Sequence, residues 1–113
     1  MELLVLVLNK PDELEILMKE FVNIGLKGAT VIDSYGMASF LHNMDDIPMF
    51  GSLKMLINNN QTSNKTVFVV LKKEQVKRAM ATIKAVIGDL SQTNVGIAFT
   101  IPISQVEGGT FDN

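Results

Sequence analysis

The sequence has no cysteine, one histidine and one arginine, and each scarcity removes a class of functional site. Without cysteine there is no disulfide, thiolate metal site or cysteine nucleophile. Because Arg78 is the single arginine, an anionic ligand must be held mainly by lysines and backbone amides. His42 has no second histidine or cysteine with which to form a transition-metal site, so we interpret it as a loop residue.

Charge of either sign is also sparse, with ten basic residues against twelve acidic ones. Nucleic-acid binders carry a concentrated basic patch, so we expect no nucleic-acid partner. The apolar run near the N-terminus is too short to span a bilayer and has no basic leader, so we expect no membrane insertion and a cytoplasmic location. At 113 residues and 47% apolar content, the sequence predicts a single domain over residues 1–113.

Apolar runs predict four strands, at residues 3–8, 29–35, 65–71 and 96–103. Apolar residues at helical spacing follow the first and third strands, and glycines at 25 and 88 end these helices. Two strand-helix-strand halves predict an α+β, ferredoxin-like βαββαβ fold. Right-handed crossovers place strands one and three in the centre of a four-stranded antiparallel sheet, with both helices on one face. The glycine-containing tail at 107–113 is predicted to fray.

The two central strands are apolar at odd and even positions alike, so both of their faces are apolar. Helices on one side would leave the other apolar face uncovered, which is typical of an interface. We therefore expect self-association through the sheet.

The segment between strands two and three, residues 37–64, is too long for an ordinary connection and too apolar for simple disorder. Its flexible thioether side chains favour docking on an irregular partner surface, and the alternative is packing back on the domain or on a neighbouring subunit. Asp45 and Asp46 within it precede Ile-Pro and read as turn residues. The candidate partner-docking residues are Met44, Met49, Phe50, Leu53 and Lys54.

Several short motifs carry a resemblance that extends over most of the chain. They are the proline-led helix after the first strand, the segment 24–31 (IGLKGATV), Gly36 at the start of the long loop, VIGD at 86–89, and GIAF followed by IPI at 96–103. In these motifs the chain resembles the PII nitrogen-regulatory family of signal-transduction proteins.

The resemblance implies a homotrimer that is a regulatory protein and not an enzyme. In such a trimer, small effectors such as an adenine nucleotide bind in clefts between subunits, and the long T-loop docks on a membrane transporter or an enzyme. Carried onto this sequence, it assigns the adenine-side wall, the T-loop base and the start of the phosphate-facing B-loop. These ligand-binding residues are, in that order, Leu8, Gly28, Ala29 and Thr30; Gly36 and Met37; Gly88 and Asp89.

Basic residues of the family pattern are missing from this chain. Ser39 and Phe40 stand where the family has arginine and glutamine, Leu90–Ser91 replaces a basic residue, and the C-terminal arginine pair reads Val106–Gly109. The long loop also contains no tyrosine for covalent modification. A triphosphate would meet almost no positive charge, which leaves a less charged adenine nucleotide, a different effector or no ligand.

Two other interpretations remain open at this point. One is a structural interaction module that has lost nucleotide binding, and the less favoured one is a metal-handling protein or enzyme on the same fold. Asp33–Ser34 has no histidine nearby in sequence to act as a base, and alternation along a strand explains the pair. Gly88–Asp89 could equally be a helix end followed by an Asx turn.

Overall fold

The computed structural model describes residues 1–9, 11–37, 63–92, 95–109 and 111. Their secondary structure follows the predicted order, and the strand predicted at 29–35 has the predicted bounds. The elements are β1 (Glu2–Leu8), a 3-10 turn (Pro11–Glu13), α1 (Leu14–Asn23), β2 (Ala29–Tyr35), β3 (Ser63–Leu71), a second 3-10 turn (Lys73–Gln75), α4 (Val76–Ile87) and β4 (Gly96–Pro102).

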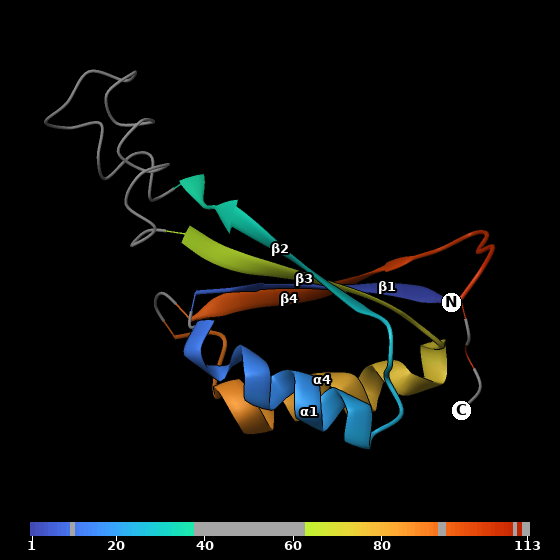
Figure 1. The fold of residues 1–113 in the computed structure, drawn as a ribbon, viewed down its shortest axis with the longest axis horizontal. Coiled ribbons are helices and arrows are strands. Elements are labelled where there is room, and N and C mark those ends of the chain that lie inside the picture. Colours follow the sequence, from blue (N-terminus) through green and yellow to red (C-terminus); the bar gives the residue numbers. More distant parts are fainter. Residues whose placement is uncertain (10, 38–62, 93–94, 110, 112–113) are drawn as a thin grey trace, which may run out of the picture.

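The four strands form one antiparallel sheet in the order β2-β3-β1-β4, with β1 and β3 in the centre. Helices α1 and α4 lie next to each other against one face of this sheet (Figure 1). The predicted α+β, ferredoxin-like fold and its two central strands are thus confirmed. Pro102 ends the edge strand β4, where its missing N–H costs no inner ladder bond.

The core lies between the sheet and the two helices. Alternate residues of β1 turn toward the helices, and Leu4, Leu6 and Leu8 are at most 1% exposed. Each helix contributes apolar residues spaced four apart, which lie on one helical face and point toward the sheet. These inward helical residues are Leu17 and Phe21 of α1 and Ala79, Ile83 and Ile87 of α4.

The opposite face of the sheet is also apolar, and we call it the outer face. Strand register places on it Leu3, Val5 and Val7 of β1, Thr66, Phe68 and Val70 of β3, and Ile97, Phe99 and Ile101 of β4. On β4, Ile97 is 57% and Phe99 41% exposed. No helix or strand of the described residues covers this face (Figure 1).

Strand β3 begins at Ser63, two residues before the predicted start. Asn64 pairs with Ser34 of β2 and is a strand residue, so residues 63 and 64 of the predicted 37–64 loop belong to the sheet. Among the described helices, none is long and apolar enough to cross a membrane.

Gly96 starts β4 opposite Leu8 and leaves no room for a side chain. A Cβ atom there would lie 2.3 Å from the Val7 carbonyl oxygen. We expect Gly96→Ala to raise the free energy of folding by about 2–3 kcal/mol, because the β1–β4 ladder must shift. Chemical denaturation measures this change. Gly28→Ala is the matched control, because nothing lies within 4 Å of its Cβ position; equal losses in both variants would contradict the prediction.

Candidate functional site

The predicted ligand-binding residues lie at two opposite ends of the sheet. Leu8 pairs with Gly96 at the end of the sheet where Tyr35 of β2 pairs with Ser63 of β3, which we call the loop end. Gly36, Met37, Gly88 and Asp89 follow strand or helix ends at this same loop end (Figure 1).

The other predicted residues lie at the opposite end, where Glu2 pairs with Leu71 and Pro102; we call this the tail end. Ala29 starts β2 there and pairs with Val69. The six steps along the chain from Thr30 to Gly36 span about 20 Å of extended strand. One subunit therefore does not bring the two sets of predicted residues together.

At the loop end, Gly88 and Asp89 form a helix end followed by an Asx turn. Gly88 has φ +98° and donates its N–H to the Lys84 carbonyl at 3.0 Å, which closes α4. Asp89 Oδ1 accepts the Ser91 Oγ hydrogen bond at 2.7 Å and the Ser91 N–H at 2.9 Å. These two bonds hold the pKa of Asp89 below its ordinary value, and the bond from the Ser91 hydroxyl has the larger effect. The positive charge of Lys84 lowers the pKa by a smaller amount.

A polar cluster of Ser34, Asn64 and Thr66 interrupts the apolar outer face beside Gly36. The Ser34 hydroxyl bonds Asn64 Oδ1 and lies 2.7 Å from Thr66 Oγ1. Ser34 has one hydrogen and donates it to Asn64, so Thr66 must donate to Ser34. Asn64 is only 7% exposed, and a Cβ added at Gly36 would lie 3.4 Å from its Nδ2. The cluster thus fixes the exit of β2 from the sheet.

At the tail end, a cavity of about 300 Å³ lies between the turn after α1 and the C-terminal segment. Gly28, a predicted ligand residue, lines it, and Lys27 is the one basic residue among the described lining residues. The remaining lining residues are Gly25, Leu26, Val70, Gln75, Val106, Glu107, Gly108, Gly109 and Phe111. The described part of the predicted frayed tail therefore forms one wall of this cavity.

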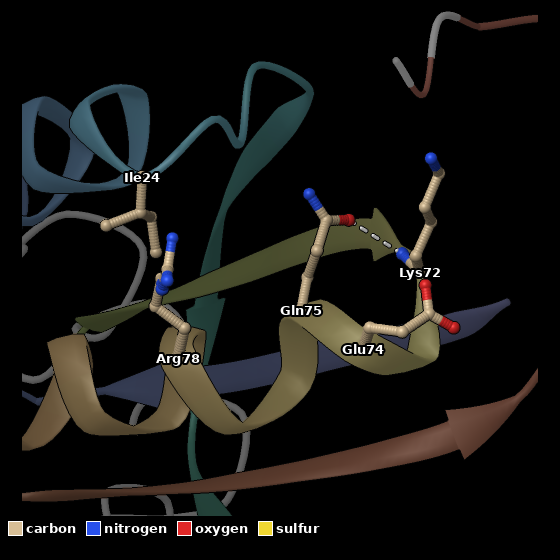
Figure 2. A pocket seen from close by; sticks show the side chains of 5 residues that line it. All are labelled: Ile24, Lys72, Glu74, Gln75 and Arg78. Carbon is tan, nitrogen blue, oxygen red and sulfur yellow. Dashed lines mark hydrogen bonds between the residues drawn. The ribbon is translucent and has the colours of Figure 1, made fainter. Parts of the chain in front are cut away.

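A second cavity of about 310 Å³ adjoins the start of α4, and Gln75 lines both cavities. Its lining residues are Ile24, Lys72, Glu74, Gln75 and Arg78 (Figure 2). Gln75 Oε1 accepts the Lys72 backbone N–H at 2.8 Å, and the Gln75 N–H donates to the Lys72 carbonyl at 2.9 Å. This reciprocal pair holds the Gln75 side chain in place at the cavity wall.

Asp33 and Ser34, the other candidate residues that the structure describes, do not form a reactive pair. Asp33 pairs with Lys65 on the helix side of the sheet, whereas Ser34 turns to the outer face, so strand alternation explains both. Among the described residues, no three histidine, cysteine or acidic side chains gather to hold a metal ion. His42, Asp45, Asp46 and the predicted docking residues Met44, Met49, Phe50, Leu53 and Lys54 lie outside the described residues.

Sequence reasoning missed the Arg78–Gln75 cavity and the Ser34 cluster. The Lys72-x-x-Gln75 spacing was a usable signal, because a glutamine three residues after a helix start can accept the N-cap N–H. The cluster joins residues about thirty positions apart, so it required the strand register.

Neither a protein-family model nor a curated protein matches this chain. The resemblance to PII proteins thus stays a prediction from short motifs.

The Asp89 turn predicts an acid-dependent change at the loop end. Its folded pKa is depressed, so the turn's stabilisation is present above the ordinary aspartate pKa and is lost as pH falls through the lowered value. NMR titration of the Asp89 carboxyl should show a midpoint below that of an unperturbed aspartate, and Ser91→Ala should raise it. Lys84→Gln should raise it less. An ordinary Asp89 midpoint in the unmodified chain would contradict this reading.

In the polar cluster Thr66 donates to Ser34 and Ser34 donates to Asn64, so removing the Ser34 hydroxyl and removing the Thr66 hydroxyl should destabilise the fold by different amounts. Ser34→Ala leaves buried Asn64 Oδ1 without its donor and should cost about 1–3 kcal/mol of folding free energy, whereas Thr66→Val should cost about 1 kcal/mol. Denaturant titration of both variants measures the difference. A larger loss in Thr66→Val would show that the donor order is reversed.

Proposed function

We propose that this chain is a PII-like signalling domain that self-associates into a trimer, senses a small effector between subunits and docks a partner through the segment after Gly36. The observation that carries the proposal is the uncovered apolar outer face. On β1, β3 and β4 the outer-face positions are apolar except Asn64 and Thr66, and such a face needs a cover of matching chemistry. In the proposed trimer, the same apolar surface of the two other subunits covers this face.

The division of the predicted ligand residues supports an effector site between subunits. Leu8, Gly36 and Gly88 lie at the loop end, and Gly28 and Thr30 lie at the tail end of the same sheet. A ligand that contacts both sets must bridge two copies of the chain. In this proposal the loop end of one subunit faces the tail end of its neighbour.

The charge around these residues bears on the class of effector. Within the described residues of the tail-end cavity, Lys27 is the one cation and Glu107 opposes it. Leu90 and Ser91 follow Asp89 and add no positive charge at the loop end. A weakly charged adenine nucleotide such as the monophosphate therefore fits the proposal better than a triphosphate.

The position of the long segment between β2 and β3 supports a role in docking. Both of its anchors, Gly36 and Ser63, lie at the loop end, as does the Asx turn of Asp89. An effector bound at this end would touch the base of the segment. Binding could thereby be transmitted to a partner, which we propose to be a transporter or enzyme.

The assembly is tested by multi-angle light scattering coupled to size exclusion. We expect the mass of three chains, and we expect Phe99→Lys to shift it toward one chain, because a lysine at the outer face would be desolvated in the interface. Val22→Lys is the matched control, since Val22 is 62% exposed on α1 and should leave the mass unchanged. A monomeric unmodified chain would exclude the proposed assembly.

Effector binding is tested separately by thermal shift against adenosine mono-, di- and triphosphate. A ligand that binds the folded state raises the melting temperature, and we expect the largest rise with the monophosphate. A trimer without any nucleotide response would favour the structural interaction module over the sensor. Loss of the response in the Phe99→Lys monomer would place the effector between subunits.

A further inference from the structure

The cavity at the start of α4 combines hydrogen-bond donors that have no partner with an apolar wall. Arg78, the only arginine of the chain, lines it, and its guanidinium has no ion pair or hydrogen bond within the described residues. A guanidinium offers a planar fork of N–H donors that matches a carboxylate. An unpaired fork at a cavity wall is the first element of an anion site.

Gln75 supplies a second donor in a fixed orientation. Its Oε1 accepts the Lys72 backbone N–H at 2.8 Å, so its Nε2 group is directed away from that bond. The amide nitrogen carries two N–H donors and has no partner among the described residues. Figure 2 shows this nitrogen at the free tip of the side chain, between Arg78 and Lys72.

The other lining residues set polarity and size. Ile24, which packs on the edge of the core, provides an apolar wall, and Figure 2 shows it next to Arg78. Glu74 also lines the cavity, on the Lys72 side of Gln75 and away from Arg78 (Figure 2). The volume of about 310 Å³ lies at the small end of ligand sites.

We infer that this cavity binds a small organic carboxylate with a short apolar tail. The carboxylate is held between the Arg78 guanidinium and the Gln75 amide, and the tail lies on Ile24. The site belongs to one subunit and does not depend on the proposed trimer or on the nucleotide. It would give the domain a second ligand input at the tail end of the sheet.

NMR titration of the full chain with butyrate at constant ionic strength tests the inference. We expect saturable shifts of the Gln75 side-chain amide and the Ile24 methyl groups, with about three- to ten-fold tighter binding than for acetate, because two further methylenes contact the apolar wall. Inorganic phosphate, which has no apolar tail, should bind more weakly than butyrate.

Two substitutions on α4 each remove one positive charge, one inside the cavity and one outside it. Comparing them distinguishes specific binding by Arg78 from a general effect of charge. Arg78→Gln should weaken butyrate binding at least about ten-fold, because a charge-assisted hydrogen bond is lost. Lys77→Gln, exposed on the same helix and not part of the cavity wall, should change it about two-fold or less. Both positions are exposed, so both variants should fold.

Three results would overturn the inference. They are the absence of a saturable shift, equal weakening by Arg78→Gln and Lys77→Gln, and phosphate or acetate binding as tight as butyrate binding. Each can be read whether or not the chain is a trimer.

Discussion

The structure depends on one constraint: its two central strands carry apolar side chains on both faces, and the helices cover only one. Leu4, Leu6 and Leu8 of β1 are sealed against α1 and α4, while Val5 and its neighbours face the other way. Burial of apolar area stabilises a small domain by about 25 cal/mol per Å², so an uncovered sheet face leaves much of this stabilisation unused. The fold is thus complete as a monomer on its helix side and incomplete on its outer side.

The polar cluster of Ser34, Asn64 and Thr66 marks where the apolar outer face stops. Its three side chains satisfy one another across β2 and β3, so this part of the face carries its own hydrogen bonds. The cluster lies at the loop end, beside Gly36, where the chain leaves the sheet. An association surface that ends at a fixed polar boundary has a defined register along the strands, because sliding past it would bury hydroxyl and amide groups against apolar ones.

Much of the fold could be predicted from the sequence because its signals are local. The strand at 29–35 begins after a glycine and is β-branched at its centre, and the two helices end shortly before Gly25 and Gly88. The start of β3 was placed two residues late because Ser63 and Asn64 have no strand-like composition. They belong to β3 because they pair with Tyr35 and Ser34 of β2, about thirty positions away in the sequence.

The candidate sites were less predictable for a related reason. The motif-based residues at 28–30 and 36–37 look like one site in the sequence, but an extended strand separates them by its length. Conversely, Ile24 and Arg78 carry no common motif, and only the packing of α1 against α4 brings them to one cavity. The sequence shows which residues have suitable chemistry. The connections between strands and helices determine which of these residues lie close together.

The two ends of the sheet differ in the chemistry they offer. The loop end contains backbone turns and the acidic Asp89, whose bonds are already satisfied by Ser91. The tail end contains Lys27, Lys72 and Arg78 around two cavities that share Gln75. Because a cation without an ion pair attracts anions and a satisfied carboxylate does not, Arg78 makes the tail end the better place for the anionic part of a small ligand. In the proposed trimer this end would face the loop end of a neighbouring subunit, where Gly36 begins the long segment.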